Sequence, residues 1–182
     1  NSRDYAGNAT LIGVTNISAS SATMTADMAP RSGVTGDNVH YYESGDIANL
    51  GFEGATVWTG LRTVNDTAHT NFDGVDVYVT DPVGATIDIY YYTSMAAGLP
   101  LGLIHSQAGF AAGPGWNRLL LATPQPFPIN AERGIVLKIV NNSAPYPAAF
   151  TASDTGSGRS YIDDDGNGTF YSICPSFCGD LN

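Results

Sequence analysis

Charged residues are scarce in this sequence, and lysine is almost absent. Charged residues make up 13% of the 182 residues, and Lys138 is the only lysine. The 17 Asp and Glu residues outnumber the 7 Lys and Arg residues, so the formal net charge is −10 at pH 7. An acidic surface repels the phosphates of nucleic acids and of anionic membranes. We therefore expect neither nucleic acid nor a membrane surface as a partner.

Long apolar runs are missing as well. No apolar stretch approaches the roughly 20 residues of a transmembrane helix, so the sequence predicts no membrane insertion. The chain opens on Asn1 without a signal peptide, which favours a processed piece of a longer exported precursor. The abundance of Gly, Ser, Thr, Asn and Tyr over charged residues is frequent in secreted β-proteins. We therefore expect a secreted, extracellular or cell-surface location.

Cysteine occurs only at Cys174 and Cys178. A zinc site would need a second Cys or His pair at ligand spacing, and the sequence offers none. Two alternatives remain, a small disulfide-closed loop and two free thiols. The extracellular character of the rest of the chain favours the disulfide.

Motifs for catalysis are hard to find. None of the histidines (His40, His69 and His105) belongs to an HExxH arrangement, and Gly156–Ser160 lacks the strand–turn–helix context of a nucleophile elbow. Carboxylate pairs for glycoside cleavage could be drawn from the 17 acids in many ways, so no pair is singled out. The sequence thus predicts a chain with no catalytic residues.

Short runs with a period of two dominate the chain, whereas helical periodicity is nearly absent. Gly, Pro, Asn and Asp separate these runs at regular intervals. This pattern predicts an all-β fold, a two-sheet antiparallel sandwich of the jelly-roll kind. The predicted strands of its main part are 55–61, 72–80, 86–93, 101–106, 117–122, 134–139, 148–152, 160–162 and 169–173.

Residues 1–30 differ from the rest and are predicted to form an N-terminal hairpin and linker, with the sandwich domain spanning 31–182. The hairpin strands would be 9–17 and 22–28. An isolated hairpin is barely stable, so it must pair with something. It either extends the main sheet or reaches another domain or subunit.

An acidic turn, Asp163–Gly168, lies between two strand-like runs near the C-terminus. It fits the first six positions of the calcium-loop pattern D-x-[DN]-x-[DN]-G, with Asp163, Asp165 and Asn167 as candidate ligands. Position twelve is Cys174 rather than the bidentate Glu, and no flanking helices are evident. A complete EF-hand is therefore not expected.

Two interpretations of this turn remain. In one, carbonyls or the carboxylates of Asp154 or Asp180 complete a partial calcium site. In the other, the turn is solvated and Asn167-Gly168 supply the positive φ angles of a hairpin. Because clustered carboxylates repel each other without a cation, we keep calcium as a candidate cofactor.

Aromatic residues are the second candidate for function, since they can stack on sugar rings or on a protein surface. Aromatic side chains on strands are also the ordinary core of a sandwich, and Trp58 is assigned to the core. Adjacent strand residues point to opposite faces, so at least one of Tyr90–Tyr92 should point outward. The candidate ligand-binding residues are Tyr42, Tyr91, Trp116 and Tyr146.

Several short motifs between Val39 and Asn182 resemble one known family. They are Ala55-Thr56-Val57-Trp58, Phe72–Tyr78, Leu103–Gly109, Gly115–Leu119, and Arg159–Ile162 followed by Asp165-Gly166. Together they resemble the lectin-like β-sandwich accessory domains of secreted bacterial and archaeal peptidases. Residues 9–28 are similar to a segment that follows the catalytic domain in immune-inhibitor-A-like metalloproteases. The family offers no agreed catalytic residues to carry over.

The resemblance implies a non-catalytic accessory binding domain of a secreted or cell-surface protein, such as an exocellular peptidase or other hydrolase. Its partner would be a glycan, another cell-surface polymer or the catalytic domain of its own parent. The alternative is a structural subunit of an extracellular filament or surface assembly. Such subunits are joined by donated β-strands, which open sheet edges accept readily.

Overall fold

A computed structural model describes residues 12–15, 27–30, 48–51, 55–81, 83–141, 149–150, 158–163 and 165–172. The chain divides into two units, residues 1–39 and 40–182, and each is described by itself. The first contains β1 (Ile12–Thr15) and β2 (Asp27–Pro30), which pair as an antiparallel two-stranded sheet. The predicted domain boundary after residue 30 stays a prediction.

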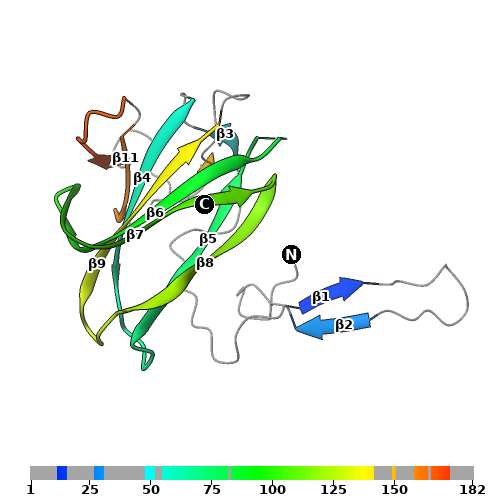
Figure 1. Cartoon of the computed structure of the whole chain (residues 1–182), viewed down its shortest axis with the longest axis horizontal. Helices are drawn as coiled ribbons and strands as arrows, with labels where there is room; N and C mark the ends of the chain where they lie inside the picture. Colours follow the sequence, from blue (N-terminus) through cyan, green and yellow to red (C-terminus); the bar gives the residue numbers. More distant parts are fainter. Residues whose placement is uncertain are drawn as a thin grey trace, which may run out of the picture. The chain divides into compact units, whose positions relative to one another are not determined.

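The second unit is built around a six-stranded antiparallel sheet in the order β12-β11-β4-β9-β6-β7 (Figure 1). Its strands are β4 (Thr56–Val64), β6 (Ala85–Ala96), β7 (Leu99–Ala112), β9 (Glu132–Val140), β11 (Ser160–Asp163) and β12 (Tyr171–Ser172). Two further pairs are β5 (Asn71–Val79) with β8 (Gly115–Pro126), and β3 (Ala48–Gly51) with β10 (Ala149–Phe150). None of the described residues forms a helix that could span a membrane.

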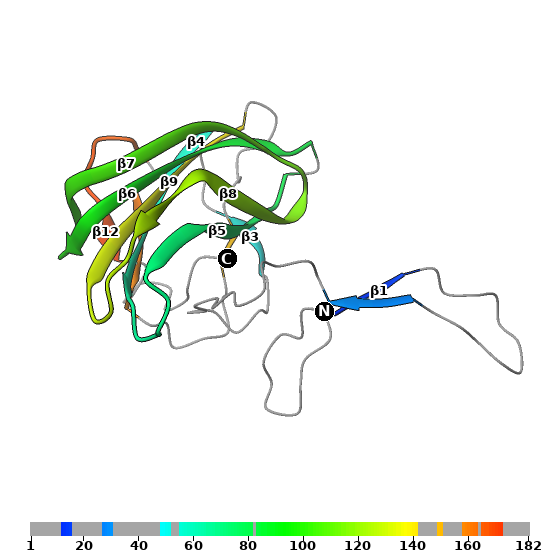
Figure 2. The same cartoon turned by 60° about the horizontal axis from the view of Figure 1, so that its bottom comes forward.

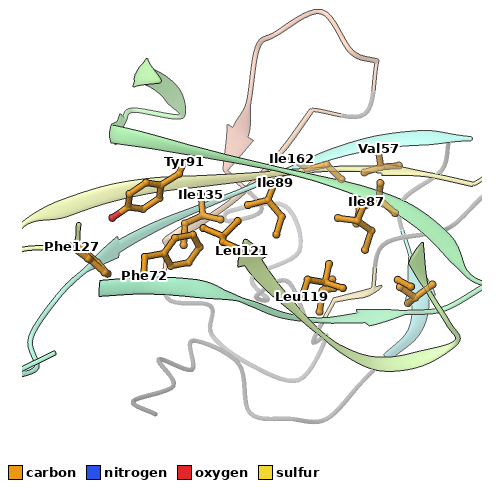
Figure 3. Close-up of a cluster of buried hydrophobic side chains, with 14 residues drawn as sticks. Val57, Phe72, Ile87, Ile89, Tyr91, Leu119, Leu121, Phe127, Ile135 and Ile162 are labelled. Atoms are coloured by element: carbon orange, nitrogen blue, oxygen red, sulfur yellow. The ribbon is translucent and has the colours of Figure 1, made fainter. Parts of the chain in front are cut away.

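The β5–β8 pair packs across one face of the six-stranded sheet, as Figure 2 shows. Buried side chains from both layers meet between them (Figure 3). Tyr91 of β6, for example, stacks on Phe72 of β5 with ring centroids 4.7 Å apart and planes at 11°. The predicted fold class, an all-β antiparallel sandwich, is confirmed, and the jelly-roll connectivity stays a prediction. The buried side chains of this core are Val57, Phe72, Val77, Val79, Ile87, Ile89, Tyr91, Ala112, Leu119, Leu121, Phe127, Ile135, Ile139 and Ile162.

Alternation along each strand decides which side chains reach this core. On β6, Ile87, Ile89 and Tyr91 point inward and are fully buried. Their neighbours Tyr90 and Tyr92 point to the opposite side of the sheet, because successive strand residues face opposite ways. We call this side, which lies opposite the β5–β8 pair, the outer face.

The end of the β6–β7 hairpin curls over part of the outer face (Figure 1). Its tip is a two-residue turn, Ala97-Gly98, with φ angles of 50° and 81°, the left-handed conformation of tight hairpins. Met95 is fully buried beside Gly60 of β4 and Gly134 of β9. A Cβ atom on Gly60 would clash with the Met95 side chain, so the absence of a side chain there lets the hairpin approach. Met95, Val136, Tyr161 and Phe170 form a second buried cluster on this side.

Candidate ligand-binding face

The pairing register places four aromatic or charged side chains in one row across the outer face. Trp58 of β4 lies opposite Asp163 of β11 on one side and Lys138 of β9 on the other. Lys138 lies opposite Asp88 of β6. Residues paired across antiparallel strands point to the same side of the sheet. An aromatic ring, an ammonium group and two carboxylates are therefore neighbours on one side of the sheet.

Two tyrosines, Tyr90 and Tyr92, add aromatic rings to the same face. The rings of Trp58 and Tyr90 lie 5.5 Å apart at an interplanar angle of 36°. The Lys138 Nζ lies 5.4 Å from the Trp58 ring centroid, a cation–π contact that holds the only lysine in place. Trp58, Tyr90 and Tyr92 are half-buried, and all three pack against the second buried cluster. The cluster thus supports them from below while part of each side chain reaches the surface.

Tyr90 and Tyr92 are neutral at physiological pH. Burial raises the pKa of Tyr90 above its ordinary value, and the nearby Asp88 and Tyr92 raise it further. Burial also raises the pKa of Tyr92. Both phenols therefore keep their protons and can donate hydrogen bonds. The Asp88 carboxylate accepts a hydrogen bond from the Gly109 backbone N–H at 2.9 Å.

The acidic turn borders the same face. A methyl group placed on Gly166 would lie 3.8 Å from the Trp58 Nε1 atom. Asp163 is buried, and its two carboxylate oxygens accept hydrogen bonds from the backbone N–H groups of Gly166 and Gly168, at 2.7 and 2.8 Å. Asp165 is exposed and accepts from the backbone and side-chain N–H groups of Asn167, at 3.1 and 2.7 Å. The side chains of the turn therefore organise its backbone.

The structure corrects one detail of the sequence-based interpretation. The positive φ angles of the turn occur at Gly166 (71°) and Gly168 (85°), and Asn167 does not have one. The Asn167 Oδ1 atom instead accepts a hydrogen bond from the Thr169 N–H at 2.7 Å, which holds the exit of the turn.

Calcium binding at Asp163, Asp165 and Asn167 stays a prediction. Among the described residues, no three His, Cys, Asp or Glu side chains are grouped so that they could hold a metal ion. Asp154 and Asp180, the proposed additional ligands, lie outside the described residues. The three candidate ligands are close in space, since hydrogen bonds link Asp165 to Asn167 and join Asp163 to the glycines between and after them.

Tyr91 does not belong to a ligand-binding surface, contrary to the expectation from sequence. Its side chain is 0% exposed, and its hydroxyl donates a hydrogen bond to the Pro126 carbonyl at 3.1 Å. Burial raises its pKa to about 12, although the nearby Arg133 acts in the opposite direction. The tyrosine run does present aromatic rings outward, as expected, but through Tyr90 and Tyr92. Trp58, assigned to the core from sequence, lies half-buried beside them.

Trp116 lies on β8, in the other layer of the sandwich. It is half-buried and packs edge-on against Tyr78, with ring centroids 5.6 Å apart and planes at 82°. It is therefore not part of the Trp58 row. The candidate ligand residues Tyr42 and Tyr146 and the disulfide candidates Cys174 and Cys178 lie outside the described residues, so their roles stay predictions.

Sequence reasoning did not identify Lys138 or Asp88 as members of a site. Asp88 lies between the buried Ile87 and Ile89, and Lys138 lies between the partly buried Leu137 and the buried Ile139, so both face outward. Their meeting with Trp58 depends on the order β4-β9-β6 and on the register between these strands. No local pattern in the sequence contains that information.

Comparison with known proteins gives a likeness of fold. No family model matches the chain, and no curated protein matches its sequence. The crystal structure of the cysteine protease and lectin-like domains of Cwp84, a surface-layer-associated protein of Clostridium difficile, is similar with a TM-score of 0.50 and 19% identity. A structure of the clostridial cysteine protease Cwp84 after propeptide cleavage has a TM-score of 0.49 and 20% identity.

These matches are partial. The first covers 71% of this chain and 31% of the other, and the second covers 67% and 32%. The chain therefore spans about a third of the length of the structures that it matches. The shared feature is a β-sandwich architecture, found in a surface-associated protein that carries both a protease and a lectin-like domain.

Proposed function

We propose that the chain is a non-catalytic accessory binding domain of a secreted or cell-surface protein, and that its outer face binds a neutral glycan. The cluster of Trp58, Tyr90 and Lys138 carries this proposal. The likeness of fold to a structure with a lectin-like domain supports it. A parent with peptidase or other hydrolase activity is part of the proposal, because that neighbour joins a protease domain to a lectin-like domain.

The chemistry of the face suits a sugar. The C–H faces of sugar rings pack on aromatic side chains, and Trp58, Tyr90 and Tyr92 offer half-buried rings on a rigid sheet. The neutral phenol hydroxyls, the Lys138 ammonium and the Asp88 carboxylate provide donors and acceptors for sugar hydroxyls. The Lys138 ammonium lies opposite the Asp88 carboxylate, while the second carboxylate of the row, Asp163, is buried and accepts hydrogen bonds within the acidic turn. This balance of charge at the surface favours an uncharged ligand.

Calcium belongs to the same proposal. Asp163, Asp165 and Asn167 would hold the ion through their oxygens. The ion would supply positive charge among carboxylates and stiffen the turn next to Trp58.

A glycan array probed with the full chain tests the proposal, followed by calorimetric titration of any glycan retained. Trp58→Ala should weaken binding by about 1–2 kcal/mol, or roughly 5- to 30-fold in Kd, since half-buried aromatic area is lost. Trp116→Ala is the matched control, because it removes the other tryptophan from the other layer and should leave Kd unchanged. A flat array, or an effect of Trp116→Ala alone, would contradict the proposed site.

The second candidate is a structural subunit of an extracellular filament or surface assembly. The β1–β2 sheet supports it, because a two-stranded sheet of four-residue strands is not stable alone. Light scattering on the full chain tests this candidate. Growing polymers would favour it, whereas a discrete small species would favour the accessory domain.

A further inference from the structure

As far as the structure describes the chain, β7 is an edge strand of the six-stranded sheet. It runs for 14 residues, and among the described strands its backbone pairs only with β6. In its second half, the Gln107 Oε1 atom accepts a hydrogen bond from the Ala122 N–H of β8 at 2.8 Å, so the first half is the open part. Edge strands present unpaired N–H and C=O groups, and natural proteins usually protect them with charges, proline or short length. β7 is long and contains no Asp, Glu, Lys or Arg. Its only protective features are Pro100 near its start and two irregularities in its register with β6.

Apolar side chains project from the first half of this edge. Leu99, Leu101 and Leu103 are 50%, 51% and 55% exposed, respectively. Leu103 pairs with Tyr92, so it lies on the outer face. Exposed apolar residues that recur along one strand mark an interaction surface more often than isolated ones do.

The charge distribution points to the kind of partner. The whole chain carries a net charge of −10, yet no acidic residue occurs between Asp88 and Glu132. The only Lys or Arg in this stretch is Arg118, which forms a two-point ion pair with Asp76 at 2.9 Å for each contact. Two copies of an acidic protein repel each other least when a stretch without acidic residues faces the partner. β7 lies within it.

We propose that β7 pairs antiparallel with β7 of a second copy of this chain, so that the two six-stranded sheets become continuous across a twofold axis. Antiparallel pairing of one strand with itself is compatible with twofold symmetry, and the same patch then serves both copies. The partner provides the missing hydrogen bonds of the edge, and the leucine rows of both copies lie at the junction. This pairing goes beyond the proposed function, although Leu103 of the junction lies opposite Tyr92 of the proposed glycan face.

The main competing occupant is the β1–β2 hairpin of another copy. That contact would be head-to-tail and would generate open polymers rather than closed dimers. β2 also contains Asp27, whereas β7 contains no Asp, Glu, Lys or Arg, and the Asp88 carboxylate that is hydrogen-bonded to it lies at Gly109, in the second half of the strand. The two arrangements therefore predict different masses in solution.

Light scattering coupled to size exclusion tests the pairing on the full chain across a concentration series, at low and at high salt. We expect a species of twice the 19.0 kDa chain mass. Its share should rise with salt, because salt screens the repulsion between the two acidic copies. Leu101→Lys combined with Leu103→Lys should weaken the dimer at least tenfold. Leu120→Lys on β8, at a leucine that is 50% exposed, is the matched control and should leave the dimer unchanged.

Hydrogen exchange of the unmodified chain provides the second measurement, which does not depend on how the lysine variants fold. Exchange of β7 backbone amides should slow as the dimer forms. A monomer at every concentration, a polymer that grows without limit, or β7 exchange that is independent of concentration would overturn the proposal.

Discussion

Asp163→Ala is the substitution whose effect follows most directly from the structure. Asp163 is 2% exposed, and its carboxylate accepts two backbone N–H hydrogen bonds across the acidic turn. Hydrogen bonds to a charged acceptor contribute about 1.5–3 kcal/mol each. Both bonds are only partly buried, so water can replace some of the loss. We expect the free energy of unfolding to fall by about 2–4 kcal/mol, and Tm by roughly 5–15 °C for a chain of this size.

Urea unfolding followed by circular dichroism measures this loss. Asp165→Ala is the control, because it removes the same charge from the same turn at an exposed position. Its cost should stay below about 1 kcal/mol. Asp163→Asn keeps one acceptor oxygen and should fall between the two. Equal costs for Asp163→Ala and Asp165→Ala would refute the idea that the buried carboxylate organises the turn.

The same variants test calcium. If the turn binds calcium, added ion raises Tm and chelator lowers it. At a calcium concentration of 100 times Kd, the free energy of unfolding should rise by about 2.7 kcal/mol. Both alanine variants should then lose the response. A Tm that does not respond to calcium or chelator would remove the metal site, while leaving the effect of Asp163→Ala intact.

Two further substitutions test the contact between Gly60 and Met95 and the raised pKa of Tyr91. Gly60→Ala places a methyl group against Met95, and overpacking of this kind costs about 1–3 kcal/mol of stability. Adding Met95→Ala to the same chain should recover part of that loss in urea unfolding. Costs of the two substitutions that simply add would contradict the contact. Tyr91→Phe tests the raised pKa of Tyr91, which is about 12 in the folded chain against 10.0 for the free group. Because of this difference, the neutral phenol contributes stability below pH 10, and that stability disappears as the pH rises toward 12. The decline in Tm over that window should therefore be smaller in Tyr91→Phe, and equal declines would show that Tyr91 ionises normally.

Much of the architecture could be predicted from alternation alone. The inward side chains of β6 and β9 follow a period of two, and their bounds differ from the predicted strands by a few residues. β3 (Ala48–Gly51) was not predicted, and β7 was predicted as 101–106 but is observed as Leu99–Ala112. Pro100 precedes the predicted range and Gly109 lies beyond its end, and both residue types commonly interrupt strands. At a sheet edge, however, a proline needs no partner on its open side, and a bulge accommodates glycine.

The candidate site was less accessible to sequence reasoning. An outward aromatic among Tyr90–Tyr92 was foreseen, but which of the three belongs to the core depends on the register with β9. The row from Asp163 through Trp58 and Lys138 to Asp88 joins strands that are far apart in the chain. Sheet order decides such a row, and local patterns do not encode sheet order.

Tryptophan fluorescence tests glycan binding at the outer face most directly, since the chain has only two tryptophans. In a Trp116→Phe variant, Trp58 is the sole reporter, and its emission should change on addition of an array-positive glycan with the Kd measured by calorimetry. In the reciprocal Trp58→Phe variant, the emission of Trp116 should not change. A response from Trp116 with a silent Trp58 would contradict the account and place the ligand on the other layer of the sandwich.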